Sequence, residues 1–342
     1  MKQTAGIISS TLLVTDAEDT EDVSADVEWR NVSVTAAQHG ERIDRALANA
    51  TPEFSRSYLQ QLIEAGLVVV NALPVRKASH RVKAGDTITV ELRPTPQSQA
   101  FKPEAMPLRV VFEDEHILVI NKPAGLVVHP APGNWSGTLL NGLLAYDEGS
   151  ALVPRAGIVH RLDKDTSGLM VVARTRAAMD SLVQAIAARE VSRQYLALAH
   201  RPWVGQPRRS VEAPIGRDPR NRLRMAVVDL EKSPGKTAKT DVVFLGNSEA
   251  GCFVRCILHT GRTHQIRVHM ASLGHPLVAD VVYGGTCVPG MSRQALHACR
   301  LALVHPFTGE SLVFEAPLPD DFSGLLTAWG LRYNEGERPE CP

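Results

Sequence analysis

The stretch HRLDKDTSGLMVVA occupies positions 160–173 and joins a charged segment directly to an apolar one. Its last five residues, 169–173, form an unbroken apolar run with the length and composition of a buried strand. The preceding DTSG, 165–168, is typical of a turn in which short polar side chains hydrogen-bond the backbone and glycine takes a positive φ. That turn leaves Asp163 unexplained. Its place just before a core strand predicts a carboxylate held rigidly at the rim of a sheet, which suits a catalytic acid.

The segments around this stretch mix predicted strands and helices without a regular strand–helix–strand alternation. A helix is predicted after Thr175, which is a suitable N-cap, and its apolar positions share one face. Those positions are Met179, Leu182, Val183 and Ile186, and the predicted strands are 110–112, 117–120, 169–173 and 191–199. The irregular alternation favours an α+β fold over a doubly wound parallel sheet.

A smaller module precedes this domain. It has two helical apolar stripes, with Ser55 placed as the N-cap of the second helix and Gly66 as its C-terminal stop. Short strands are predicted at 68–70, 71–74 and 87–92. We therefore divide the chain into an acidic leader at 1–30, the small module at 31–93, a proline-containing linker at 94–106, the main domain at 107–335 and a tail at 336–342.

The composition is that of a globular protein with about two domains of roughly 150 residues each. Of the 342 residues, 44% are hydrophobic and 22% are charged, which argues against wholesale disorder. There is no apolar run of the roughly 18 residues that a membrane-spanning helix needs, so no membrane partner is expected. The five cysteines form no CxxC pair. This argues against a disulfide framework or a structural zinc site and favours a cytoplasmic location.

The charge balance conceals a basic body. The whole chain has 37 basic and 37 acidic residues, but the leader holds seven acidic and two basic ones, so the remainder has a net charge of +5. Four arginines fall within eight residues, at Arg217, Arg220, Arg222 and Arg224. Such a cluster can neutralise nucleic-acid phosphates, although a solvated basic loop has the same composition.

A second polar segment, 260–270, lies within an apolar region. Ile266, Met270 and Leu273 make a helical stripe, so His264 and Arg267 share another face of the same helix. A guanidinium on a short helix inside an apolar domain normally requires a carboxylate partner. The histidines at 259, 264 and 269 are spaced by five, which suits neither a helix face nor a strand face, and no metal site is predicted.

A third segment is Arg193-Gln194-Tyr195, on a predicted strand. A tyrosine on a strand most often fills a core or covers a surface. A functional role for Tyr195 therefore depends on the other two segments.

Together these segments resemble the pseudouridine synthases of the RluA/RluD type. HRLDKDTSGL at 160–169 is similar to the family's catalytic motif, and LHTGRTHQIRVHMASLGHPLVAD at 258–280 resembles its later arginine motif. NKPAG at 121–125 resembles the opening strand and loop. The module at 41–93 resembles an RNA-binding domain shared with a small-subunit ribosomal protein. The segment DVVYG at 280–284 departs from the family, in which proline is usual at the second position, and we expect this loop to lie away from the catalytic residues.

The resemblance implies a mixed, mostly antiparallel central sheet with flanking helices and a catalytic cleft, preceded by a small α/β RNA-binding module. It makes Asp163 the essential carboxylate, Arg267 its cationic partner with Arg262 as the alternative, and Tyr195 a contact of the target base. Further substrate-binding residues are expected at His160, Arg161, Thr166, Arg262, His264, Arg217, Arg222, Arg42, Arg45 and Arg56.

The implied reaction is the isomerisation of specific uridines to pseudouridine in large-subunit (23S) ribosomal RNA. An isomerisation needs no redox cofactor, and the sequence contains neither a P-loop nor a dinucleotide-binding motif, so no cofactor or metal is expected. The expected partner is ribosomal RNA or the precursor of the large ribosomal subunit, and the protein is expected to act as a monomer.

Three other functions are compatible with parts of this pattern. An N-glycosidase acting on RNA also works at an anomeric carbon, but such enzymes usually need two cooperating carboxylates. A non-catalytic RNA-binding or ribosome-assembly protein could keep the fold, yet it would not need Asp163. A metal-dependent hydrolase would require a metal site that the histidine spacing does not support.

Overall fold

The computed structural model describes residues 28–52, 54–92, 100–131, 133–221 and 224–333. Arg222 and nearly all of the predicted leader and tail lie outside the described residues. The chain divides into two units, Met1–Gln97 and Ser98–Pro342, which are described separately below.

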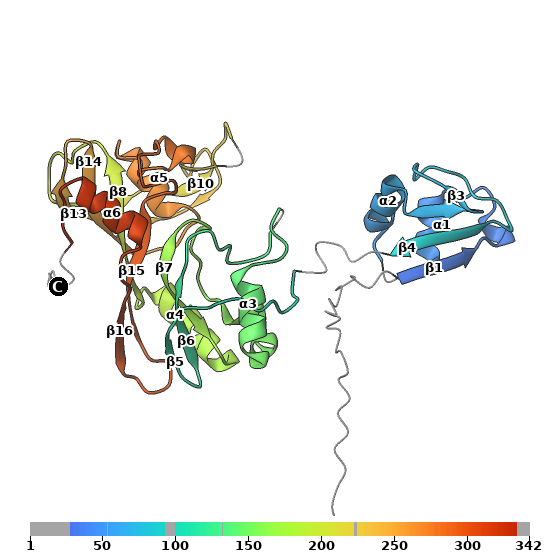
Figure 1. Ribbon diagram of the computed structural model, residues 1–342, viewed down its shortest axis with the longest axis horizontal. Coiled ribbons are helices and arrows are strands. Elements are labelled where there is room, and N and C mark those ends of the chain that lie inside the picture. The colour runs from blue at the N-terminus through green and yellow to red at the C-terminus, as the bar shows by residue number, and fades with distance from the viewer. Residues whose placement is uncertain (1–27, 53, 93–99, 132, 222–223, 334–342) are drawn as a thin grey trace, which may run out of the picture. The chain divides into compact units, whose positions relative to one another are not determined.

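The first unit is a four-stranded antiparallel sheet with two helices that share its apolar core (Figure 1). The strand order is β1-β4-β2-β3. The elements are β1 (Glu28–Ser33), η1 (Ala36–Gln38), α1 (Ile43–Ala50), α2 (Arg56–Ala65), β2 (Val68–Val70), β3 (Leu73–Pro74) and β4 (Thr87–Leu92). The predicted caps of α2 are confirmed, because the Ser55 hydroxyl accepts a hydrogen bond from the Tyr58 amide and Gly66 is left-handed with φ +79°. The predicted end of the leader is wrong, since residues 28–30 belong to β1 and pair with 90–92.

The second unit contains a nine-stranded mixed sheet. Its order is β5-β6-β7-β15-β8-β14-β13-β9, with β16 paired to β15. The strands are β5 (Val110–Glu113), β6 (Ile117–Lys122), β7 (Ser167–Ala173), β8 (Ser192–His200), β9 (Arg208–Glu212), β13 (Lys239–Asn247), β14 (Gly251–Leu258), β15 (Leu296–Val304) and β16 (Ser311–Glu315). All pairs are antiparallel except β7–β15, so the predicted α+β fold with a mostly antiparallel sheet is confirmed.

Helices cover both faces of this sheet. The helices α3 (Leu139–Tyr146) and α5 (Gln265–Ser272) pack in one apolar cluster, while α4 (Arg176–Ala188) and α6 (Asp320–Ala328) pack in two others on the opposite side. The remaining elements are η3 (Glu148–Leu152), η4 (Pro154–Gly157), η5 (Val281–Tyr283) and a small sheet of β10 (Ile215–Arg217), β11 (Met225–Val227) and β12 (Gly235–Lys236). The N-cap at Thr175 is confirmed, but Val183 is 45% exposed and does not belong to the buried stripe of α4.

The C-terminal half of the predicted linker belongs to the second unit. The Asn141 side-chain amide donates hydrogen bonds to the carbonyl oxygens of Ala100 and Lys102, and the Glu104 amide donates to the Asn141 carbonyl. Glu104 also accepts a hydrogen bond from the Gly137 amide. Residues 100–104 are therefore fixed against the start of α3 by backbone groups, which their polar, proline-containing sequence did not indicate. In the part of the chain that the structure describes, no helix is long and apolar enough to span a membrane.

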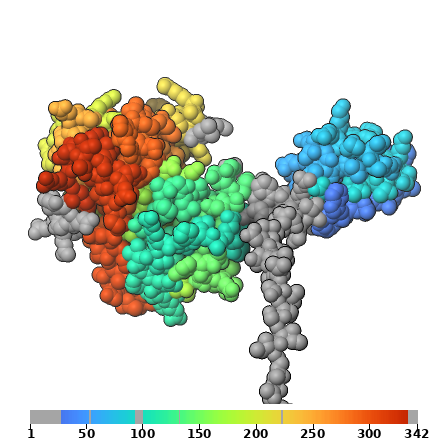
Figure 2. Space-filling view, viewed as in Figure 1, coloured from blue at the N-terminus to red at the C-terminus, as the bar shows by residue number. Residues whose placement is uncertain are grey.

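The parallel pair β7–β15 joins the two halves of the large sheet. Ala298 lies opposite Gly168, and the Ser167 hydroxyl is 2.9 Å from Nδ1 of His297. Gly168 has φ +118°, and a side chain there would overlap the backbone of Ala298. In the space-filling view the orange and red segments of this unit lie directly against its green ones (Figure 2). Glycine at 168 therefore permits both the turn after Asp163 and the close approach of the two strands.

Replacing Gly168 with alanine should lower the free energy of unfolding by more than about 2 kcal/mol, because the substitution combines a disfavoured φ with a backbone clash. Urea unfolding of the purified chain measures this. Gly324→Ala is the matched control, since it lies inside α6 and a side-chain carbon added there would contact no other part of the protein within 4 Å. The control should raise stability by about 0.5–1 kcal/mol. Equal effects at the two positions would contradict the account of Gly168.

Candidate active site

Asp163 lies in the loop between η4 and β7. The Thr166 amide donates a hydrogen bond to the Asp163 carbonyl, which closes a turn at 163–166. The turn predicted at 165–168 is therefore displaced, because Ser167 and Gly168 belong to β7, although Gly168 has the expected positive φ. The Asp163 side chain is 16% exposed, and its Oδ2 accepts a hydrogen bond of 3.2 Å from Nη1 of Arg267. The predicted pairing of these two residues, 104 positions apart in the chain, is present in the structure.

Lys122 fixes the backbone on the other side of this loop. Its ammonium group, at the end of β6, donates to the carbonyl oxygens of Pro123, Leu126 and Lys164 at 2.8–3.0 Å. Burial lowers the pKa of Lys122 to about 7, against the opposing charges of Asp165 and Asp163. The lysine thereby connects the loop after β6 to the residue that follows Asp163. No pattern in the sequence indicates this role of Lys122.

The main partner of Arg267 is Asp280. Arg267 Nε and Nη2 each donate a 2.7 Å hydrogen bond to the fully buried Asp280 carboxylate, which forms a bidentate pair. Burial alone would lower the pKa of Arg267, but Asp280, with a smaller contribution from Asp163, raises it above its ordinary value. The expectation that segment 280–284 lies away from the catalytic residues is therefore wrong. Its first residue is a direct partner of the arginine.

His264 and Tyr283 complete this side of the site. The Tyr283 hydroxyl accepts from the Met225 amide at 3.0 Å and lies 2.8 Å from Nδ1 of His264, where the tautomer of the histidine decides which group donates. Nε2 of His264 is 3.9 Å from Oδ1 of Asp163. Burial lowers the pKa of His264, which favours the neutral imidazole. The Arg267 guanidinium lies 5.0 Å from the centroid of the Tyr283 ring.

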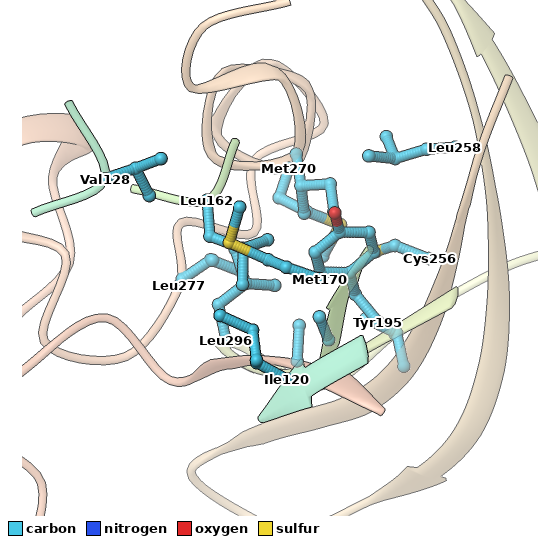
Figure 3. Packing of buried hydrophobic residues seen from close by; sticks show 14 of the residues in the cluster. Ile120, Val128, Leu162, Met170, Tyr195, Cys256, Leu258, Met270, Leu277 and Leu296 are labelled. Atoms are coloured by element: carbon cyan, nitrogen blue, oxygen red, sulfur yellow. The ribbon is translucent and has the colours of Figure 1, made fainter. Parts of the chain in front are cut away.

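Tyr195 lies on β8 in the apolar cluster beneath α5. It is 5% exposed, and Leu162, Met170 and Met270 belong to the same cluster (Figure 3). Burial raises the pKa of Tyr195 to about 12, so the phenol is protonated at neutral pH. Tyr195 can therefore serve as an aromatic surface and as a proton donor, but it is not ionised at neutral pH and cannot act as a general base in the resting enzyme.

A cavity of about 600 Å³ brings these groups together. Asp163, Tyr195 and Arg267 line it together with all five substrate-binding residues predicted nearby, namely His160, Arg161, Thr166, Arg262 and His264. His160 Nε2 accepts a hydrogen bond from the Val171 amide, and burial lowers the pKa of His160 to about 3. Arg262 was the alternative candidate for the cationic partner of Asp163. Its side chain instead donates a hydrogen bond to the Thr237 carbonyl. The Thr166 hydroxyl accepts from the side chain of Gln294.

The other predicted RNA contacts are not part of this cavity. Arg217 is an exposed residue of β10. In the first unit, Arg42 and Arg56 both pair with the fully buried Asp44, and Arg45 pairs with Glu41. The side chains of Arg42 and Arg56 remain 45% and 50% exposed, so they can still face a ligand, while the Arg56 pair joins α2 to α1. Their acidic partner was not anticipated from the sequence.

Two of the three evenly spaced histidines have other hydrogen-bond partners. His259 lies 3.1 Å from Asp241, and His269 contacts the Thr240 hydroxyl and the Ala213 carbonyl. The described residues include no group of three or more histidine, cysteine or acidic side chains arranged to hold a metal ion.

Comparison with known proteins places this geometry in a family. Residues 116–272 match the model of the RNA pseudouridylate synthases, and residues 41–88 match the S4 domain. A ribosomal large subunit pseudouridine synthase D of Neisseria meningitidis is 47% identical over 91% of this chain and 86% of that protein. The enzyme of the same name from Nitrosomonas europaea is 48% identical over 84% of each chain. The chain belongs to the RNA pseudouridylate synthase family.

A solved structure supports the same assignment. Human RNA pseudouridylate synthase domain containing 1 has 29% sequence identity and a TM-score of 0.50, over 64% of this chain and 86% of that one. This RNA pseudouridine synthase therefore has a family catalytic domain that carries the cavity, and an S4 domain that corresponds to the first unit.

Arg267→Ala should reduce the stability of the synthase by roughly 3–5 kcal/mol, because it leaves the Asp280 carboxylate buried without a counter-charge. Chemical denaturation measures the loss. Arg176→Ala is the control, since Arg176 forms an exposed ion pair with Asp180 that contributes at most about 1 kcal/mol. An Arg267→Ala variant that unfolds like the control would show that the buried pair is not needed for stability.

Proposed function

We propose that this synthase converts specific uridines of large-subunit (23S) ribosomal RNA to pseudouridine, with Asp163 as the essential carboxylate. The observation that carries the proposal is the position of the Asp163 carboxylate at the wall of a cavity that a buried tyrosine also lines. Asp163 accepts one hydrogen bond from Arg267, whose own position is fixed by a bidentate pair with Asp280. The relatives named as large-subunit synthases support the choice of RNA. Ribosomal RNA, or the precursor of the large subunit, is therefore the proposed partner.

The reaction breaks the bond between uracil N1 and the anomeric carbon, turns the base, and forms a bond from C5 to the same carbon. C5 loses one proton and N1 gains one, so the product is an isomer of the substrate. It neither oxidises nor reduces the substrate and requires no cofactor. Asp163 acts either as the nucleophile at the anomeric carbon or as the base that removes a ribose proton. In their ionised forms Asp163, Arg267 and Asp280 carry one net negative charge, so Arg267 orients Asp163 without cancelling the charge of the site.

The cavity suits a single extruded nucleoside. Its volume of about 600 Å³ falls within the usual range of small-molecule sites, about 300–1,000 Å³. A uridine in folded RNA must leave its stack to enter, which costs a few kcal/mol. Stacking on an aromatic ring such as Tyr195 returns about 1–3 kcal/mol. The protonated phenol is also available for a late proton transfer.

A second RNA-binding unit supports a large structured substrate. The S4 domain has exposed basic groups at Arg42, Arg45 and Arg56, and the catalytic domain has Arg217 and the cavity rim at Arg161 and Arg262. Two linked grips raise the effective affinity for one RNA molecule. Arg222 belongs to the same proposal and lies outside the described residues.

We further propose that the synthase acts as a monomer in the cytoplasm. One copy of the chain brings Asp163, Tyr195 and Arg267 to the same cavity, so the proposed reaction needs no residue from a second copy. Cys252, Cys256, Cys287 and Cys299 are free thiols, as is usual in a reducing compartment.

Among the described residues that line the cavity, Asp163 is the one carboxylate, so an N-glycosidase would lack a second one there. Asp280 is fully buried and both of its oxygens bind Arg267, so it does not face a water molecule. Asp165, two positions after Asp163, is not among the residues that line the cavity. A hydrolase that needs two cooperating carboxylates is therefore disfavoured.

The deciding experiment compares the wild type, Asp163→Asn and Asp165→Asn on 23S ribosomal RNA, with pseudouridine mapped at single-nucleotide resolution. We expect modified sites with the wild type and Asp165→Asn, and none with Asp163→Asn, because only Asp163 faces the cavity beside Arg267. Release of free uracil would identify an N-glycosidase. Tight RNA binding without modification by the wild type would identify a non-catalytic binding protein, and loss of modification with a chelator would indicate a metal-dependent enzyme.

Tyr195→Phe should retain RNA binding within about twofold and reduce single-turnover rates by at least about tenfold, because it keeps the aromatic face and removes the proton donor. Tyr146→Phe is the control, since Tyr146 is exposed on α3 and donates to Glu113. Binding constants and single-turnover rates on the same RNA distinguish the steps. If binding and rate fall together in Tyr195→Phe, the hydroxyl has a structural role instead.

A further inference from the structure

Arg193 is a buried cation without a counter-charge. It lies at the start of β8, is 6% exposed, and lines the cavity with Tyr195, which follows two positions later on the same face of the strand. Its Nε is a buried nitrogen without a hydrogen-bond partner, and no carboxylate among the described residues lies within ion-pairing distance of its guanidinium. The structure around the cavity therefore contains a donor group that the folded chain does not use.

The groups nearest to Arg193 do not compensate its charge. His160 shares the cavity wall, and Arg193 adds to the effect of burial in lowering the pKa of that histidine to about 3, so the two do not attract each other. On the other side is Gly261, where a side-chain carbon would approach Nη1 of Arg193 to 2.9 Å. The glycine leaves room for the guanidinium at the cavity without offering it an acceptor side chain.

Arg267 lines the same cavity and differs from Arg193 in its counter-charges. Both arginines are about equally buried, but Arg267 binds two carboxylates whereas Arg193 binds none. Removing a guanidinium from water costs several kcal/mol unless hydrogen bonds and a counter-charge offset that cost. The fold offsets it for Arg267. For Arg193 no described residue supplies that offset, and an anionic ligand in the cavity would supply it.

We propose that Arg193 binds a backbone phosphate of the RNA next to the uridine that enters the cavity. This rests on the proposed function, because RNA is the ligand that the cavity is taken to accept. Phosphodiesters are the only anions of RNA, and a planar guanidinium binds their oxygens in a bidentate manner. The uracil base is neutral and would satisfy hydrogen bonds of Arg193 but not its charge. The phosphate is thus held on the β8 side of the cavity, and Asp163 is held by Arg267 on the α5 side.

The test is a coupling experiment between one arginine and one phosphate. The RNA is a fragment of 23S ribosomal RNA that binds the protein, prepared with a single neutral methylphosphonate at each loop linkage in turn. Dissociation constants are measured in an Asp163→Asn background, which prevents turnover. We expect one linkage at which the neutral group weakens binding at least about fivefold with Arg193 and less than twofold with Arg193→Met. In Arg193→Lys the same linkage should remain sensitive, because the charge is kept.

Two further readouts separate a ligand-binding role from a structural one. Without RNA, Arg193→Met should melt at the same temperature or higher, because it removes an uncompensated buried charge. With unmodified RNA it should bind at least fivefold more weakly and show a salt-dependence slope smaller by about 0.7, as for one single-strand phosphate contact. Arg176→Met, which removes an exposed arginine of α4, should change neither.

Three outcomes would overturn the proposal. They are a lower melting temperature or loss of folding in Arg193→Met, equal sensitivity to every methylphosphonate in both proteins, and weaker binding of Arg193→Met without coupling to any linkage. The last would assign Arg193 to the base instead. The methylphosphonate experiment measures binding and not turnover. Its failure would reject the role of Arg193 while pseudouridine formation stands, and failure of the site mapping would reject the proposed function while the coupling of Arg193 to a phosphate stands.

Discussion

The site depends on one buried guanidinium. Arg267 receives its position from Asp280, whose carboxylate is fully buried and binds two of its nitrogens, and it presents the remaining one to Asp163. Such a cluster is stable only when every charge has its partners, because each ion has lost most of its hydration. A shift of α5 or of the segment 280–283 would therefore disrupt the whole cluster of Asp163, Arg267 and Asp280, and would not merely break one hydrogen bond. This makes the direction of the Asp163 carboxylate a property of the fold.

The backbone around Asp163 is fixed by independent contacts. Gly168 allows β7 to lie against β15, and Lys122 holds the carbonyl of Lys164 from the opposite side. The loop between them is too short to move while both ends are held. A catalytic group needs to be within about 0.5 Å of its productive position, and rigid strands provide that accuracy better than loops do. The short distance between Asp163 and the start of β7 is thus functional.

Much of this could be predicted from the sequence, and the failures have physical causes. The rule that a buried guanidinium needs a carboxylate predicts a partner for Arg267, and the family resemblance identified that partner as Asp163. The dominance of Asp280 could not be deduced, because the sequence does not say which of two carboxylates a cation faces. The role of Lys122 depends on three backbone carbonyls that no side-chain pattern reveals. Residues 100–104 were assigned to the linker because their contacts with α3 are also made by backbone groups.

The two buried arginines of the cavity differ in what completes them. Arg267 finds its counter-charges within the chain, so its geometry exists before any ligand binds and costs no reorganisation when one does. Arg193 has no counter-charge among the described residues, so its burial is a cost that the folded protein bears until an anion enters. A ligand that carries negative charge at this position would offset the desolvation cost of the Arg193 guanidinium when it binds. An uncharged nucleoside would contact the tyrosine and the carboxylate but leave Arg193 uncompensated, so this difference favours a uridine embedded in an RNA chain over a free one.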